Sequence, residues 1–88
     1  MHEIVLRVPC GSSARSKTIL SALAPELGES VPKSRVSGGV EGETLIIIIE
    51  SPELAALRAA ANSYLRWCDL ALRTVGAAEA GARDEKED

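Results

Sequence analysis

The side chains that could carry covalent or metal chemistry are few in this chain and lie far apart in the sequence. His2 is the single histidine, and Cys10 and Cys68 are the two cysteines. A zinc site needs three or four such ligands at suitable spacing, so these three residues do not form a convincing set. We therefore predict no metal site and no cofactor. The separation of the cysteines gives no reason to expect a disulfide, so we expect two reduced thiols.

Serine, glycine and acidic residues also give no catalytic arrangement. Ser63 has no candidate base, and Gly38-Gly39 lacks the strand-loop-helix context of a phosphate-binding loop. The segment 11–15, Gly-Ser-Ser-Ala-Arg, is more simply a helix cap than an anion site. Glu50 and Glu53 flank a predicted helix start, where negative charge is favourable for structural reasons. We predict that the chain is not an enzyme.

Length and composition limit the chain to one small domain. Its 88 residues cannot build two cores, and its 45% hydrophobic content contains no phenylalanine. A core of small and branched side chains at this size is marginally stable alone, so oligomerisation is an expected supplement. The longest apolar run, Leu45 to Ile49, is far too short for a membrane span, and we expect a cytoplasmic protein.

The charge pattern argues against autonomous nucleic-acid binding. The net charge is −3, and residues 77–88 supply all of it, so the remainder of the chain is neutral. Tight binding to DNA or RNA usually needs a basic surface that displaces several counterions.

Hydrophobic periodicity predicts the element order β-α-β-β-α. Residues 2–8 alternate as a strand does, and Ile19, Leu20, Leu23 and Leu27 keep helical spacing. We expect an α+β fold in which a three-stranded antiparallel sheet carries two helices on one face. The predicted elements are a strand at 2–8, a helix from Ser12 or Ser13 to about Leu27, a connection at 28–32, strands at 34–40 and 43–50, and a helix from Ser51 to Val75.

Glycines mark the predicted end of the last helix and an interruption in the predicted hairpin. Gly76 is predicted to end the last helix, which leaves residues 1–76 as the domain and residues 77–88 as a disordered acidic tail. Gly38-Gly39 interrupts the first strand of the hairpin, which indicates a bulge or an edge position. In contrast, Leu45 to Ile49 is apolar at every residue, so both faces of that strand should be covered.

Two helices can cover only one face of a three-stranded sheet. Val5, Ile46 and Ile48 would then be left on the other face. A monomer exposing them would present an aggregation-prone patch, so we predict a symmetric homodimer that buries this sheet surface. Register or twist could instead hide part of it.

The last helix has more apolar surface than a sheet needs. Steps of about 100° per residue place Leu54, Leu57, Ala61, Leu65, Cys68, Leu72 and Val75 on a core stripe, with Tyr64 at its margin. A second arc of this helix surface carries no charged residue and is not needed to cover the sheet. It is predicted to bind a partner protein, with Trp67 as the anchor, unless the first helix covers it. Its candidate partner-binding residues are Ala56, Ala60, Ser63, Trp67 and Leu70.

Several short runs resemble a known family. They are Ala24-Pro25-Glu26-Leu27, Arg35-Val36, Leu57-Arg58-Ala59 and Asn62-Ser63-Tyr64-Leu65-Arg66-Trp67. From about residue 3 to residue 75 the chain resembles the small dimerising subunit of the KEOPS complex, the archaeal and eukaryotic CTAG/Pcc family. The short, compact chain favours the archaeal branch.

The resemblance implies a non-catalytic dimerisation and scaffold subunit. In that family the small subunit dimerises and contacts a catalytic ATPase-like subunit, and the complex adds a threonylcarbamoyl group to an adenosine of certain tRNAs. Asn62, Ser63, Arg66 and Trp67 match the family motif most closely.

An RNA-contacting accessory module is the alternative function. Basic side chains on an assembled complex could contact tRNA phosphates without reading sequence. The candidate RNA contacts are Arg58, Arg66, Arg73, Lys33 and Arg35, although solvated charge is the simpler interpretation of each. A small-ligand regulatory domain of the same element order would need a polar pocket, which the sequence does not indicate.

Overall fold

The computed structural model describes residues 1–27 and 33–87, with side chains described for all of these except Glu26 and residues 78–87. The element order is β-α-β-β-α, as predicted, with a short 3-10 turn after the first helix. The elements are β1 (His2–Pro9), α1 (Ser13–Leu23), η1 (Ala24–Glu26), β2 (Arg35–Glu41), β3 (Thr44–Ser51) and α2 (Leu54–Glu87). The predicted connection at 28–32 lies outside the described residues.

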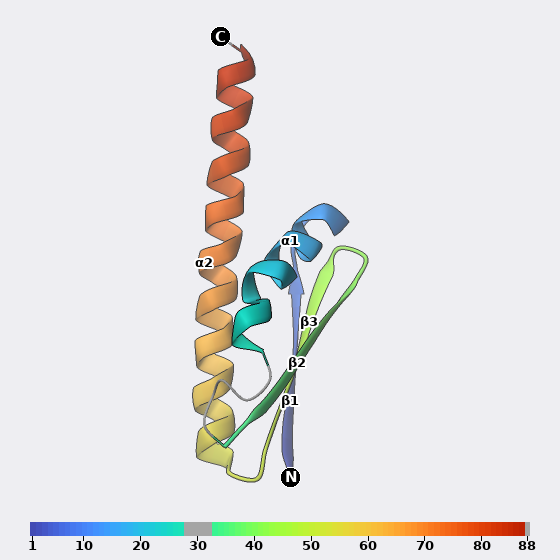
Figure 1. Cartoon of the computed structure of the whole chain (residues 1–88), viewed down its shortest axis with the longest axis vertical. Coiled ribbons are helices and arrows are strands. Elements are labelled where there is room, and N and C mark those ends of the chain that lie inside the picture. Colours follow the sequence, from blue (N-terminus) through green and yellow to red (C-terminus); the bar gives the residue numbers. More distant parts are fainter. Residues whose placement is uncertain (28–32, 88) are drawn as a thin grey trace.

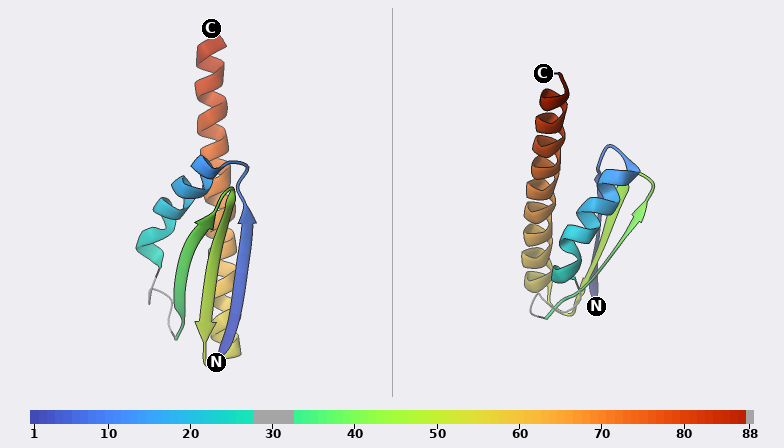
Figure 2. Two further views of the ribbon diagram at one scale, coloured as in Figure 1. Left: turned by 90° about the vertical axis from the view of Figure 1, so that its right-hand side faces the viewer. Right: turned by 45° about the horizontal axis from the view of Figure 1, so that its top comes forward.

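The three strands form one antiparallel sheet in the order β1-β3-β2. Both helices lie on the same face of this sheet, and the other face carries no element of the described chain (Figures 1 and 2). Helix α2 packs over β1 and β3, whereas α1 packs over β2 and β3. The predicted α+β architecture with two helices on one sheet face is therefore confirmed.

The central strand β3 supplies the middle of the core. Leu45, Ile47 and Ile49 point toward the helices and are fully buried, because each lies between two neighbouring strands and under both helices. The hairpin turn between β2 and β3 has Gly42 at φ +59°, a conformation that glycine adopts at little cost. A five-residue apolar run thus forms the most protected strand of the sheet, as expected for a central position.

The strand β2 lies at the sheet edge, as its glycine pair predicted. A Cβ atom on Gly38 would stand 3.0 Å from Leu20 Cδ1 and 3.3 Å from Leu27 Cδ1. Glycine at this position therefore lets α1 and the segment after it approach the sheet closely.

Both helix starts use serine side chains. The Oγ of Ser12 accepts a hydrogen bond from the Arg15 backbone N–H at 3.1 Å, which caps α1. The Oγ of Ser51 accepts one from the Glu53 N–H at 3.1 Å, and its hydroxyl donates to the Lys33 carbonyl at 2.7 Å. Ser51 therefore links the end of β3, the start of α2 and the residues before β2.

The predicted end of the last helix is wrong. Helix α2 does not stop at Gly76 but continues to Glu87, so the backbone after Gly76 is helical. An interior glycine costs only about 1 kcal/mol relative to alanine, and the residues that follow include many good helix formers. The division into a domain at 1–76 and a tail at 77–88 stays a prediction.

The predicted core stripe of α2 is also partly wrong. Tyr64, placed at the margin, is fully buried, whereas Leu54 and Leu65 are 45% and 48% exposed. The buried arc is centred on Leu57, Tyr64 and Cys68, and it includes small residues that let α2 lie close to the sheet. The helix is thus rotated toward the arc that was predicted to meet a partner.

Candidate protein-interaction surfaces

The sheet surface opposite the helices, called the open face below, carries the predicted dimer residues. Val5 pairs in register with Ile48, and Arg7 pairs with Ile46, so all four side chains lie on this face. Val5 is 42% exposed, and Ile46 and Ile48 are half-buried by their neighbours in the sheet. The structure therefore brings Val5, Ile46 and Ile48 together as one apolar centre.

Charged side chains surround this centre, and the sequence analysis did not single out most of them. Arg7 on β1 forms an ion pair with Glu41 on β2, with 3.4 Å between the guanidinium and carboxylate atoms. At the other end of the face, Glu50 lies between Glu3 and Arg35 in register. The strand alternation that placed Val5 and Ile48 contained this information, because residues two apart share a face.

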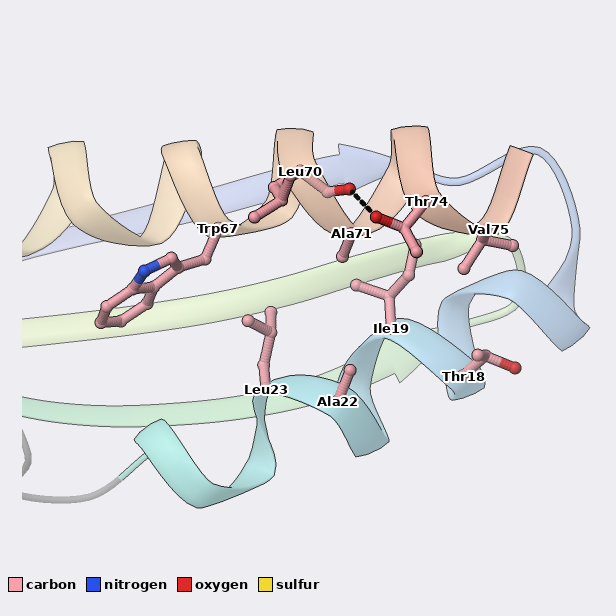
Figure 3. Close-up of a pocket in the computed structure, with 9 residues that line it drawn as sticks. All are labelled: Thr18, Ile19, Ala22, Leu23, Trp67, Leu70, Ala71, Thr74 and Val75. Atoms are coloured by element: carbon pink, nitrogen blue, oxygen red, sulfur yellow. Dashed lines mark hydrogen bonds between the residues drawn. The ribbon is translucent and has the colours of Figure 1, made fainter. Parts of the chain in front are cut away.

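The second surface is a groove between the two helices, called the α1–α2 groove below. It encloses about 400 Å³. Side chains of α1 and α2 converge on it from both sides (Figure 3). The lining residues are Thr18, Ile19, Ala22, Leu23, Trp67, Leu70, Ala71, Thr74 and Val75.

The sequence analysis allowed that the first helix covers this arc of α2, but it named no α1 residue of the groove. Trp67 packs edge-on against Tyr64, with 5.0 Å between ring centroids and 80° between ring planes. Because Tyr64 is fully buried, this contact holds the half-buried indole in a defined position beside the groove. Leu70 is 63% exposed and is the most accessible large apolar side chain of α2.

The five candidate partner-binding residues divide into three groups. Trp67 and Leu70 line the groove, whereas Ala56 and Ser63 are partly exposed on α2 outside it. Ala60 is fully buried in the hydrophobic core, so its assignment to a partner contact is a correction. The cause is the rotation of α2 described above, which turns Ala60 toward the sheet and α1. The two alternatives for this arc both apply in part, since α1 covers one portion and leaves the groove open.

The candidate RNA contacts do not form one surface. Arg58, Arg66 and Arg73 are exposed along α2, and Arg73 forms an ion pair with Asp69 at 3.1 Å. Arg35 lies on the open face, on the opposite side of the sheet from α2. Lys33 lies before β2, where its Nζ is 3.1 Å from a Glu53 carboxylate oxygen.

The cysteine thiols are buried and poorly suited to nucleophilic chemistry. Cys10 and Cys68 are each 2% exposed and belong to the same core cluster. Burial raises the pKa of the Cys68 thiol to about 11, and the nearby Cys10 adds to the shift. The Cys10 thiol donates a hydrogen bond to the Val8 carbonyl at 3.3 Å. Thiolate is the reactive form, so the raised pKa makes Cys68 a poor nucleophile. Both buried cysteines pack as small apolar core side chains.

No metal-binding cluster of three or more histidine, cysteine or acidic side chains occurs among the described residues. Neither of the two described α-helices has a stretch long and apolar enough to cross a lipid bilayer. The notable surfaces of the described chain are thus the open face and the α1–α2 groove.

Comparison of the sequence with known proteins finds a matching family and a relative. Residues 3–76 match the model of a family described as "Transcription factor Pcc1". The chain is also 44% identical over 45 residues to the KEOPS complex subunit Pcc1 of Pyrococcus abyssi (strain GE5 / Orsay). That alignment covers 49% of this chain and 55% of the relative, so the chain spans little more than half of the relative's length. The resemblance predicted from the short sequence runs is confirmed.

Proposed function

The chain belongs to the Pcc1 family, and from this membership we propose that it is a non-catalytic dimerisation and scaffold subunit of a KEOPS complex. In this proposal it binds the catalytic ATPase-like subunit and a second copy of itself. It thereby supports threonylcarbamoyladenosine modification of tRNA in the cytoplasm, and the chemistry belongs to its partner.

The observation that carries the proposal is the placement of two apolar surfaces on opposite sides of the sheet. The open face lies on one side, and both helices lie on the other (Figure 2). The α1–α2 groove is lined by residues of these two helices. A protein bound in the groove would therefore not obstruct a protein bound to the open face. A dimer formed through the open face would present two grooves outward, and it could join two copies of the larger assembly.

A second copy is the occupant proposed for the open face. Val5, Ile46 and Ile48 form a continuous apolar centre with charges around it, the distribution found in protein interfaces. A two-fold dimer buries the same patch on both chains in one step.

A helix of the catalytic subunit is the occupant proposed for the α1–α2 groove. A groove between two helices that is lined with small and apolar side chains suits an amphipathic helix. Leu70 and Trp67 provide accessible apolar area at one side of the groove, and Ala22 and Ala71 leave space for close approach. The aromatic anchor Trp67 is of the residue type that most often dominates interface energies.

The alternative proposal, an RNA-contacting accessory module, has weaker support. Arg35 lies on the open face, away from Arg58 and Arg66 on α2. Arg73 and Lys33 each pair with a carboxylate of their own chain. A phosphate backbone would therefore meet basic residues on two separate sides of the molecule rather than on one strip.

Co-purification from the native source tests the proposed function. The scaffold proposal expects the ATPase-like subunit to elute with the tagged chain, and nuclease treatment should not release it. A Leu70→Arg chain serves as the matched bait with an altered groove, and it should recover much less of that subunit. Recovery of tRNA without the ATPase-like subunit would favour the alternative and contradict the scaffold assignment.

A further inference from the structure

We propose that the second copy stacks on the open face with its strands reversed, so that Arg35 of one chain meets Glu41 of the other. The inference rests on the proposed dimer and specifies its geometry. It is drawn from the charge pattern of the open face, which the strand register defines residue by residue.

The open face is a grid of four rows, each with one residue from β1, β3 and β2. The row at one end holds Glu3, Glu50 and Arg35. The row at the other end, beside the hairpin turn, holds Pro9, Thr44 and Glu41. The two middle rows contain the apolar pair Val5 and Ile48, and then Arg7 beside Ile46.

Two face-to-face arrangements with a two-fold axis in the plane of the interface keep the strands of the two sheets aligned, as stacked sheets commonly do. If the axis runs along the strands, β3 stacks on β3 with equal ends together. Glu3 then opposes Arg35 twice, but Glu50 opposes Glu50 of the second copy at the middle of the same row. Like charges that face each other across an interface are unfavourable, and the half-buried position of Glu50 limits their hydration.

If the axis instead runs across the strands, each end row meets the opposite end row. Glu50 then opposes the neutral Thr44, and Arg35 opposes Glu41. The two-fold axis produces the Arg35–Glu41 contact twice. No like charges directly oppose each other in this arrangement, whereas in the first arrangement the Glu50 pair counts against the two Glu3–Arg35 contacts. Charge complementarity therefore favours the second arrangement.

The apolar centre is consistent with the same arrangement. Rotation about the axis across the strands places Ile48 of one chain over Ile46 of the other, twice, and stacks the apolar centres. It also places Arg7 over Val5 of the second copy, one row from Glu3 and one row from Arg7 of that copy, so each Glu3 carboxylate can offset the repulsion between the two guanidinium groups. Glu41 can keep its contact with Arg7 and also accept a hydrogen bond from Arg35 of the second copy, because a carboxylate has two acceptor oxygens.

The test uses two single charge reversals, Arg35→Glu and Glu41→Arg. In the proposed geometry each variant opposes like charges twice in its homodimer. Each homodimer should therefore dissociate at a concentration at least about fivefold higher than the wild-type dimer. In a 1:1 mixture the heterodimer pairs opposite charges at both contacts, so dimerisation should recover to at least the wild-type level.

Sedimentation equilibrium on the two variants, their mixture and the wild type provides the measurement. An axis along the strands predicts a different pattern. Glu41→Arg would be neutral because Glu41 would face Pro9, Arg35→Glu would be weakened by Glu3, and the heterodimer in the mixture would be no tighter than the Glu41→Arg homodimer. Unweakened variants, or a mixture without recovery, would overturn the proposed orientation while leaving the dimer intact. A wild-type chain that stays monomeric would overturn the dimer and this geometry together.

Discussion

The guanidinium of Arg7 and the carboxylate of Glu41 lie 3.4 Å apart, although their strands β1 and β2 are separated by β3. The pair therefore bridges the full width of the open face near the hairpin turn. Both side chains are about two-thirds exposed, at 66% and 69%, so the pair contributes little to folding stability by itself. Its consequence is positional, because it holds the Arg7 guanidinium toward Glu41 in the end row beside the hairpin turn, on the side away from Val5 and Ile48.

Leu70→Arg should reduce binding of the catalytic subunit at least about tenfold, which corresponds to roughly 1.4 kcal/mol. The reason is that Leu70 is 63% exposed at the α1–α2 groove, where a charged side chain would have to be desolvated on binding. Leu65→Arg is the matched control, because Leu65 is 48% exposed on α2 but does not line the groove. Isothermal titration calorimetry measures the affinity of both variants for the catalytic subunit. Equal losses for the two variants would contradict the assignment of the groove.

Ala60→Arg should act on folding instead of on a contact surface. Ala60 is fully buried beside Leu57 and Tyr64 in the core, so an arginine there overfills the space between α2 and the sheet. We expect a loss of about 1 to 3 kcal/mol or more in the free energy of unfolding. Urea denaturation followed by circular dichroism measures it. A variant with wild-type stability and weakened partner binding would show that Ala60 is a surface residue after all.

Folding stability should fall as the pH rises from about 9 toward about 11, in part through Cys68. Its pKa is raised from 9.0 to about 11 by burial, with a smaller contribution from Cys10. In this window the unfolded thiol loses its proton while the folded thiol keeps it, so alkali favours the unfolded chain. Cys68→Ala should start less stable but lose less stability across the same window. Thermal melts of both proteins at pH 8 and at pH 10 give the comparison, and identical losses would contradict the assignment.

Removal of residues 77–88 should leave the melting temperature nearly unchanged. This segment contains no apolar side chain larger than alanine. The end of α2 also extends beyond the sheet and α1 (Figure 1). Differential scanning calorimetry of the chain ending at Gly76 checks this expectation. A drop of several degrees would show that the segment packs against the domain.

Strand positions could be predicted well from the sequence, because successive side chains of a strand point to opposite faces of the sheet. The alternation around Val5 and the all-apolar run of β3 predicted which residues share the open face, and the register confirms it. These features depend on local backbone geometry, which varies little from one sheet to another. The strand order β1-β3-β2 was not predicted, because the apolar run of β3 predicts covered faces and does not identify neighbouring strands.

The rotation of α2 about its own axis, which decides which of its residues face the sheet, could not be predicted as well. Weighting by hydrophobicity favoured Leu54 and Leu65, yet the close approach of helix to sheet selects the small Ala60 and the flat ring of Tyr64. The α1–α2 groove depends further on how near α1 comes to β2, and that approach is set by the missing side chain of Gly38. Such distances arise from tertiary packing and have no periodic signal in the sequence.

Sedimentation velocity at micromolar concentration tests the central claim, that the open face joins two copies of this chain, most directly. The account predicts a species of twice the chain mass of 9.3 kDa for the wild type. Ile48→Lys places a charge in the apolar centre and should give the single-chain mass, whereas the control Ala59→Lys, at an exposed position of α2, should stay dimeric. A wild-type protein that sediments as a monomer, or an Ile48→Lys protein that dimerises as tightly as the wild type, would contradict it.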